Sequence, residues 1–207
     1  MVTLYGMRDS GNCYKPRLLL HKLGRPFRHV EVNALDGSTR RQEFLALNAN
    51  GRVPLLEIED GRRIAESNAI LLYLAEGTQF IPANVYERGL VYQWLFFEQY
   101  SHEPYVAVRR ALMRFPERQK DATPERLAQT LKLGTDALAV MDKQLGATPF
   151  MAGTTLSVAD IALYAYTYDA HQYGFELEQF PAVSAWLQRV EADPGHVPED
   201  WVPTEEA

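Results

Sequence analysis

The apolar residues of this 207-residue chain follow two patterns, and the change between them is the strongest constraint on its fold. Over residues 1–76, short strand-like runs alternate with segments of helical periodicity. Residues 77–83 break this pattern and are typical of a linker, and no later segment has a convincing strand signal. The sequence therefore predicts an α/β domain over 1–76, a linker over 77–83 and an all-helical domain over 84–207.

The first domain is predicted to have the element order β-α-β-α-β-β-α. Asp60 and Gly61 form a dipeptide that favours a tight hairpin turn between two strands. Ser67 stands where the capping residue of a helix is expected. The predicted strands cover residues 2–5, 28–32, 54–58 and 62–65, and the predicted helices cover 14–23, 38–47 and 67–76.

The second domain begins with a long helical stretch that Pro104 should kink or split. Thr123 precedes a proline, and this pair predicts a strong helix start. Ser157 and Pro181 mark the starts of two further helices. We expect the tail after Gly195 to wrap the surface or to fray.

Composition and charge narrow the function classes. The net charge of −6 argues against nucleic acid as the main partner. Residues 1–80 hold 11 basic and 9 acidic side chains, whereas the rest holds 10 and 18. A mildly basic first domain suits a small anion, although two surfaces of differing composition explain the numbers equally well. No apolar run approaches the ~18 residues of a membrane span. No signal-peptide pattern opens the chain, so we expect a cytoplasmic protein.

Cys13 is the only cysteine, which excludes a disulfide within the chain and the familiar zinc patterns. The five histidines have no paired metal-ligand spacing, and there is no glycine-rich phosphate loop. We therefore expect no metal.

The segment 10–13 is the first of three motifs that carry chemistry, and it lies between a predicted strand and a predicted helix. Backbone amides at a helix start attract an anion, and they stabilise a thiolate held there. The Ser10 hydroxyl can donate a hydrogen bond to the thiolate of a ligand. An ordinary serine cap on the helix is the alternative interpretation.

The other two motifs are the approach to Pro54 and the pair Glu66-Ser67. A cis bond before Pro54 would leave the backbone of Val53 able to pair with an extended ligand, beside Arg52 for a carboxylate. Ser67 can cap its helix and leave amides for a carboxylate, while Glu66 can accept from an ammonium group. The pair suits an amino-acid-like end group. A plain loop-to-strand junction and simple helix capping remain alternatives.

Taken in order, these motifs resemble the glutathione transferase family, in its bacterial, serine-type form. The matching segments are 4–5, 10–17, 44–54, 65–70, 150–153, 156–161 and 180–186, so the resemblance covers nearly the whole chain. It implies a thioredoxin-like first domain, a helical-bundle second domain, glutathione as co-substrate and a homodimer. It also implies that Ser157 and Asp160 form a capping box, which we interpret as a folding device.

The resemblance assigns roles around glutathione. Pro54 would be the family's cis-proline, and the backbone of Val53 would bond the cysteinyl part. Glu66 and Ser67 would hold the γ-glutamyl end, and Arg52 would lie next to the glycyl carboxylate. The residues implied to bind glutathione are Ser10, Thr39, Arg52, Val53, Pro54, Glu66 and Ser67.

The catalytic group that faces the sulfur is predicted to be Ser10. Tyrosine-type classes use a tyrosine of the first strand, where this chain has Tyr5, but the spacing of Ser10 fits the serine-type pattern of the zeta and theta classes. Asn12 and Cys13 are the alternatives. Cys13 could instead form a mixed disulfide with glutathione.

The implied reaction is attack of the glutathione thiolate on a small, hydrophobic electrophile held between the domains. Tyr105, Arg109 and Met113 lie on one predicted helical face and could line that site, with Tyr14 closing it. A core or dimer-facing stripe explains them equally well. A glutathione-dependent disulfide reductase or peroxidase, and a non-enzymatic binding protein of the same fold, are the alternative functions.

Overall fold

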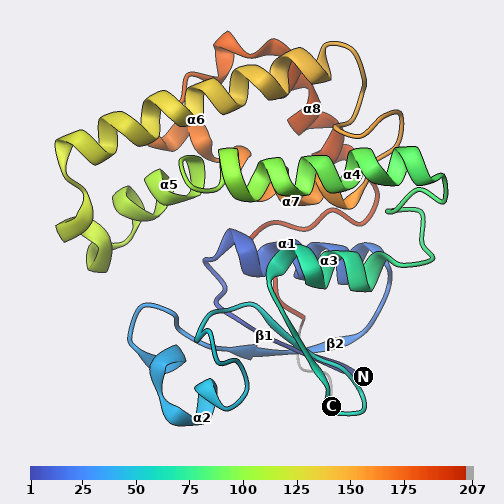
Figure 1. The fold of residues 1–207 in the computed structure, drawn as a ribbon, viewed down its shortest axis with the longest axis vertical. Coiled ribbons are helices and arrows are strands. Elements are labelled where there is room, and N and C mark those ends of the chain that lie inside the picture. Colours follow the sequence, from blue (N-terminus) through green and yellow to red (C-terminus); the bar gives the residue numbers. More distant parts are fainter. Residues whose placement is uncertain (204–207) are drawn as a thin grey trace. The chain divides into compact units, whose positions relative to one another are not determined.

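In a computed structural model that describes residues 1–203, the chain forms two compact units. One unit holds Met1–Glu76 together with the segment from Pro194 on, and the other holds Gly77–Asp193. The first contains a four-stranded mixed sheet with helices, and the second is built from helices (Figure 1). The predicted fold class, an α/β thioredoxin-like domain followed by an all-α domain, is confirmed.

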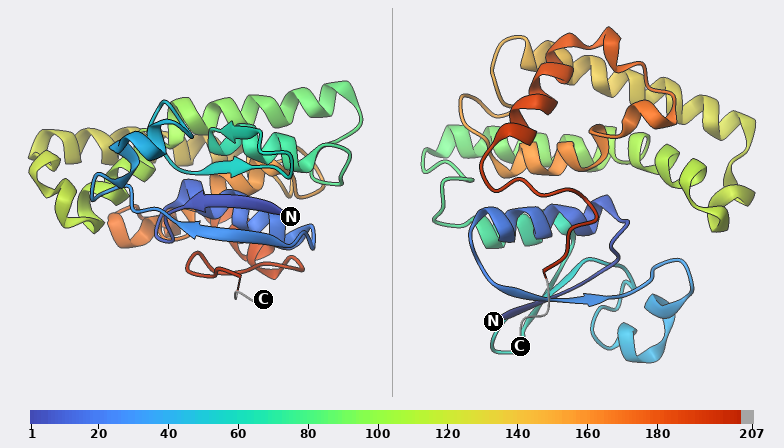
Figure 2. Two further views of the ribbon diagram at one scale, coloured as in Figure 1. Left: turned by 90° about the horizontal axis from the view of Figure 1, so that it is seen from below. Right: turned by 180° about the vertical axis from the view of Figure 1, so that it is seen from behind.

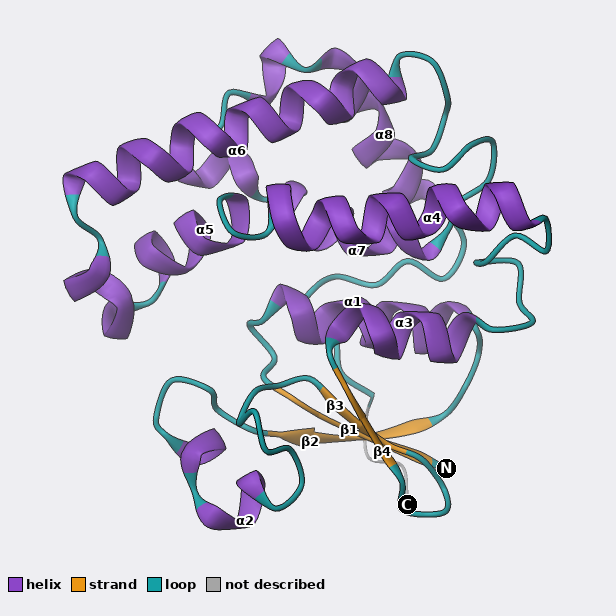
Figure 3. Cartoon of the chain, viewed as in Figure 1, coloured by secondary structure: helices purple, strands orange, loops and turns teal. Residues whose placement is uncertain are grey.

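The sheet of the first unit is built around β1, which has a parallel neighbour on one side and an antiparallel neighbour on the other (Figure 3). Leu4 of β1 pairs with His29 of β2 and with Leu56 of β3, and the side chains of Leu4 and Leu56 are fully buried. The strand order is β2-β1-β3-β4. The strands are β1 (Val2–Gly6), β2 (Phe27–Glu31), β3 (Leu55–Glu57) and β4 (Arg63–Ala65).

Two helices of the first unit, α1 and α3, lie side by side above the sheet (Figure 1). Helix α1 makes the crossover that a parallel strand pair requires, and it buries Leu18, Leu19 and Leu20 completely. The predicted helix over 38–47 forms only as two short turns, because Arg41 between them has an extended backbone. The helices are α1 (Gly11–Lys22), η1 (Ser38–Arg40), α2 (Gln42–Leu45) and α3 (Ser67–Ala75).

The tail after the last helix belongs to the first unit and not to the helical one. It runs along α1, as the red end of the ribbon shows (Figure 2). Of the two expected outcomes for the tail, wrapping is the one that the residues up to 203 show. The expected helical domain over 84–207 therefore ends earlier, at Asp193.

The helical unit is organised around α7, in which every residue is buried. The long helical stretch before Pro104 is split as expected: α4 passes into a π-helical turn, and α5 begins beyond the proline. The helices of this unit are α4 (Val85–Phe97), η2 (Glu98–His102), α5 (Val106–Arg114), η3 (Pro116–Asp121), α6 (Pro124–Leu145), α7 (Val158–Thr167), η4 (Ala170–Tyr173), η5 (Leu177–Gln179) and α8 (Pro181–Ala192).

The start of α7 is fixed by the predicted capping box. The Asp160 carboxylate accepts hydrogen bonds from the backbone and the hydroxyl of Ser157, both at 2.9 Å. It also accepts from the Met151 amide at 2.8 Å and from the Trp186 indole at 3.0 Å. Burial raises the pKa of the Asp160 carboxyl, and these hydrogen bonds oppose that rise. One side chain thus ties the loop before α7 to α8.

We predict that Asp160→Ala destabilises the protein by roughly 3 kcal/mol or more, because several buried donors lose their acceptor together. Denaturant unfolding measures this loss. Asp136→Ala is the matched control, since Asp136 lies on the surface of α6 and forms an exposed ion pair with Lys132. It should cost about 0.5 kcal/mol or less. Equal effects of the two substitutions would contradict a special role for Asp160.

Candidate functional site

The turn between β1 and α1 places Ser10 at the N-cap of α1. Its backbone is extended, with φ −102° and ψ 120°, but its side chain makes no capping hydrogen bond. The hydroxyl instead bonds the Cys13 thiol. Ser10 is therefore not the ordinary helix cap of the alternative interpretation, and it stays half-buried at the start of the helix.

Cys13 lies in the core behind Ser10 and is fully buried. The Met7 amide donates to its sulfur at 3.3 Å, and the Cα of Gly6 comes so close that an added Cβ would lie 3.1 Å from that of Cys13. Burial raises the pKa of the Cys13 thiol more than the bonds from Ser10 and Met7 lower it. A protonated, closely packed thiol is a poor nucleophile, which counts against Cys13 as the reacting group.

Asn12 joins the first turn of α1 to the first turn of α3. Its side-chain oxygen accepts from the Lys15 ammonium at 2.8 Å and from the Ser67 hydroxyl at 3.1 Å. Lys15 and Ser67 also contact each other at 3.4 Å. The Asn12 oxygen thus serves these two donors, and its amide nitrogen is the donor end of the side chain.

Lys15 was missed among the predicted site residues. It is fully buried, and a buried ammonium requires strong partners. The only sequence signal for it was its place in the serine-type pattern, where a basic residue follows the aromatic Tyr14.

Glu66 has a strained backbone directly before α3. Its φ of 69° and ψ of 118° are rare for any residue with a side chain, and such strain costs on the order of 1–3 kcal/mol. Its carboxylate accepts from Asn50 at 3.5 Å. Glu66 is also the N-cap of α3, so the expectation that Ser67 caps this helix is wrong: Ser67 is its first residue and bonds Asn12 instead.

The loop before β3 contains a cis peptide bond between Val53 and Pro54, as the resemblance implied. Asn48 holds this loop by donating to the Arg52 carbonyl at 2.7 Å. Arg52 itself is exposed, and Val53 is half-buried. Thr39 is buried beneath the loop, where its carbonyl packs against Gly51, so its side chain is poorly placed to meet a ligand.

Two of the residues predicted to line an electrophile site are buried, and their polar groups donate hydrogen bonds to backbone carbonyls instead. Tyr14 is 1% exposed, and its hydroxyl donates to the Val197 carbonyl at 2.6 Å. Arg109 is buried in the helical unit, where it donates to the carbonyls of Tyr173 and Leu127. These two assignments are therefore corrected. Tyr105 is half-buried and Met113 is 43% exposed, and their roles stay predictions.

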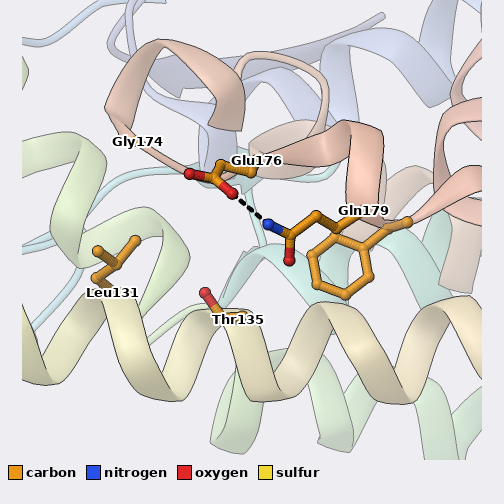
Figure 4. A pocket seen from close by; sticks show the side chains of 6 residues that line it. Leu131, Thr135, Gly174, Glu176 and Gln179 are labelled. Carbon is orange, nitrogen blue, oxygen red and sulfur yellow. Dashed lines mark hydrogen bonds between the residues drawn. The ribbon is translucent and has the colours of Figure 1, made fainter.

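A shallow pocket of about 220 Å³ opens in the helical unit (Figure 4). None of the residues predicted to bind an electrophile lines it. Among its lining residues, the Gln179 amide donates a hydrogen bond to the Glu176 carboxylate (Figure 4). Its lining residues are Leu131, Thr135, Gly174, Glu176, Gln179 and Phe180.

Among residues 1–203, no cluster of three or more His, Cys, Asp or Glu side chains is arranged to hold a metal ion. No helix in the same range is long and apolar enough to cross a membrane.

Comparison with known proteins identifies the family. The family description "Glutathione S-transferase, N-terminal domain" matches residues 1–76, and "Glutathione S-transferase, C-terminal domain" matches residues 124–189. The maleylacetoacetate isomerase of Rhizobium meliloti is 30% identical over 88% of this chain and 87% of its own length. The chain belongs to the glutathione S-transferase family.

Two further proteins extend the comparison. A glutathione S-transferase crystal structure from Pseudomonas fluorescens superimposes with a TM-score of 0.92 at 48% identity, covering 96% of this chain and 98% of that one. The disulfide-bond oxidoreductase YfcG of Escherichia coli is 28% identical over 94% of this chain and 92% of its own. The predicted family and the expectation of a transferase-type enzyme are confirmed, while the serine-type assignment stays a prediction.

The strain at Glu66 gives a test that is independent of activity. Glycine tolerates a positive φ and alanine does not, so we predict that Glu66→Gly is more stable than Glu66→Ala by about 1 kcal/mol. Alanine is also disfavoured at an N-cap, where glycine is tolerated, so the cap position acts in the same direction. Denaturant midpoints of the two variants measure it, and an alanine variant that is the more stable of the two would show that the backbone there is relaxed.

Proposed function

We propose that the first unit binds glutathione and holds its thiol as a thiolate for attack on a small, hydrophobic electrophile. The observation that carries this proposal is the Asn12–Lys15–Ser67 network. It joins the starts of two helices, so the groups suited to the γ-glutamyl end and to the sulfur belong to one rigid frame.

The γ-glutamyl end is proposed to bind at the start of α3. The first amides of a helix lack partners within the helix and favour a carboxylate, and the Lys15 ammonium lies 3.4 Å from the Ser67 hydroxyl at that point. Glu66 is exposed and can accept from the ammonium group of the ligand. The strained backbone of Glu66 supports this assignment, since strain is retained where function needs a particular geometry.

The remainder of glutathione is proposed to follow the loop before β3. The backbone of Val53 would pair with the cysteinyl residue beside the cis-proline, and the exposed Arg52 would meet the glycyl carboxylate. The buried Thr39 would contribute through the loop that it supports.

Ser10 is proposed to turn its hydroxyl from the Cys13 thiol to the glutathione thiolate and to donate its one proton there. A free thiol has a pKa of ~8.5, and lowering that pKa by about two units corresponds to ~2.7 kcal/mol. One charge-assisted hydrogen bond together with the dipole of α1 supplies an effect of that order. The thiolate then forms the sulfur–carbon bond while the leaving group departs with its electron pair. Asn12, through its donor end, is the alternative partner of the sulfur.

The relation to a disulfide-bond oxidoreductase favours a second candidate, glutathione-dependent disulfide reduction. The glutathione thiolate would attack one sulfur of the substrate disulfide and release the other as a thiolate. A second glutathione would then resolve the mixed disulfide and leave as glutathione disulfide. Because Cys13 is buried and its pKa is raised, this chemistry would use only glutathione sulfurs.

We further propose that the protein acts as a cytoplasmic homodimer that pairs through α4. Tyr86, Phe96 and Tyr100 are 75%, 75% and 83% exposed. Their helical spacing puts them on one side of α4 and its π-helical extension. Exposed aromatic side chains grouped in this way are typical of a contact surface.

We predict that Ser10→Ala lowers kcat/KM for a chloroaryl electrophile about 100-fold at neutral pH, because thiolate becomes a minor form. Calorimetry should show glutathione affinity within a few-fold of the parent.

Cys13→Ala should change kcat/KM by less than about threefold, since the thiol does not react. If Ser10→Ala kept full activity and Asn12→Ala lost it, Asn12 would be the residue that donates to the thiolate. Turnover of a disulfide far above that of the chloroaryl substrate would favour the reductase.

For the dimer, we predict a sedimenting mass of twice the 23.6 kDa of one chain. Phe96→Glu should shift the protein toward the monomer, because it places a charge in a desolvated contact. Val140→Glu, at a 48% exposed position on α6, is the matched control and should leave the mass unchanged. A parent protein that sediments as a single chain would refute the proposal.

A further inference from the structure

We propose that residues 194–203, here called the C-terminal strap, are a working part of the glutathione site, because they hold the turn that presents Ser10 through the side chain of Arg17. This inference rests on the proposed function. It assigns a positioning role to Arg17 and to a segment that no sequence motif marks.

The strap is fastened to one side of α1 by its main chain. Tyr14, Arg17 and His21 are spaced three and four residues apart and so share a helix face, and Lys22 lies next to it. Each contacts a different carbonyl of the strap. The contacts are Tyr14 with Val197 at 2.6 Å, Arg17 with Glu199 at 2.5 Å, His21 with Gly195 at 3.0 Å and Lys22 with Pro194 at 3.2 Å.

The strap also covers apolar surface. The Trp201 ring packs edge-on against His21, with 4.6 Å between ring centroids, and lies 6.1 Å from Phe27. Val197 is 7% exposed. The strap is therefore bound by packing as well as by hydrogen bonds, and Figure 2 shows its course beside α1.

Arg17 connects the strap to the turn before Ser10. Its guanidinium is fully buried, and it donates to the Met7 carbonyl at 3.3 Å and the Arg8 carbonyl at 2.7 Å, besides Glu199 of the strap. The Met7 carbonyl also accepts from the Ser10 amide at 3.2 Å. One planar group thus fixes two successive carbonyls of the turn and one of the strap.

The guanidinium transmits a change at either end because its donors form a rigid fork. If the strap leaves, Arg17 loses the Glu199 carbonyl, and water reaches a charge that was buried. The cation then gains by turning toward solvent, which releases the carbonyls of Met7 and Arg8. Ser10 loses its fixed position, and a hydroxyl that is poorly placed stabilises a thiolate less.

Linkage makes the coupling measurable from both sides. If strap docking strengthens glutathione binding by some factor, glutathione must strengthen strap docking by the same factor. A strap that opens independently of the glutathione site would exchange at the same rate with and without the ligand.

The experiment uses the full chain, with Trp201→Ala to loosen the strap and Arg17→Lys to keep the charge but remove the fork. Arg62→Lys is the control, since that side chain is 78% exposed. Hydrogen exchange of residues 194–203 is followed with and without saturating glutathione. Ultraviolet absorbance of the bound thiolate against pH gives its pKa.

We expect glutathione to slow exchange in the strap of the parent protein several-fold. We expect Trp201→Ala and Arg17→Lys to raise the pKa of the bound thiol by about one unit, a tenfold loss of thiolate, while Arg62→Lys leaves it unchanged. The inference would be overturned if hydrogen exchange of the strap were the same with and without glutathione. It would also be overturned if a variant with a loosened strap kept the thiol pKa of the parent protein. A parent protein that binds no glutathione at millimolar concentration would instead refute the proposed function, and this inference with it.

Discussion

Two buried cations on α1 hold the first turn of that helix in place, and the candidate site depends on them. Lys15 binds Asn12 and Ser67 and so fixes α1 against α3. Arg17 binds the turn after β1 and the C-terminal strap. A buried charge is costly unless its hydrogen bonds are made, so each cation penalises any arrangement in which its partners move. Leucine at either position would fill the space but would not specify the partners.

The sequence predicted the frame of the site better than its internal contacts. The element order, the capping box at Asp160 and the cis bond before Pro54 depend on local patterns or family motifs, and all three are present. The helix predicted over 38–47 was too long, because its apolar spacing does not indicate the extended backbone at Arg41. Ser67 was assigned a capping role because serine favours N-caps, whereas its hydroxyl is used by Asn12.

Helical spacing identified which residues share a face but not what covers that face. Tyr14 and Arg109 were placed correctly on helices, yet their polar groups bond backbone carbonyls of segments that are distant in the sequence. The strap is the extreme case, because α1 holds it largely through its carbonyl groups, which every residue has. Main-chain docking leaves almost no trace in the order of side chains, and Trp201 is the one residue whose character indicates an anchor.

The course of the chain gives the strap a particular meaning. The chain leaves the first unit after Glu76, forms the helical unit over Gly77–Asp193, and returns to the first unit at Pro194. Because chains are synthesised from the N-terminus, the sheet, α1 and α3 can form before the strap exists. Until then the Arg17 guanidinium lacks its Glu199 acceptor, and hydration by water is favoured because burying the charge without that partner is costly. The turn that carries Ser10 would therefore gain its final geometry only after the helical unit and the strap have been made, which couples a competent glutathione site to docking of the strap.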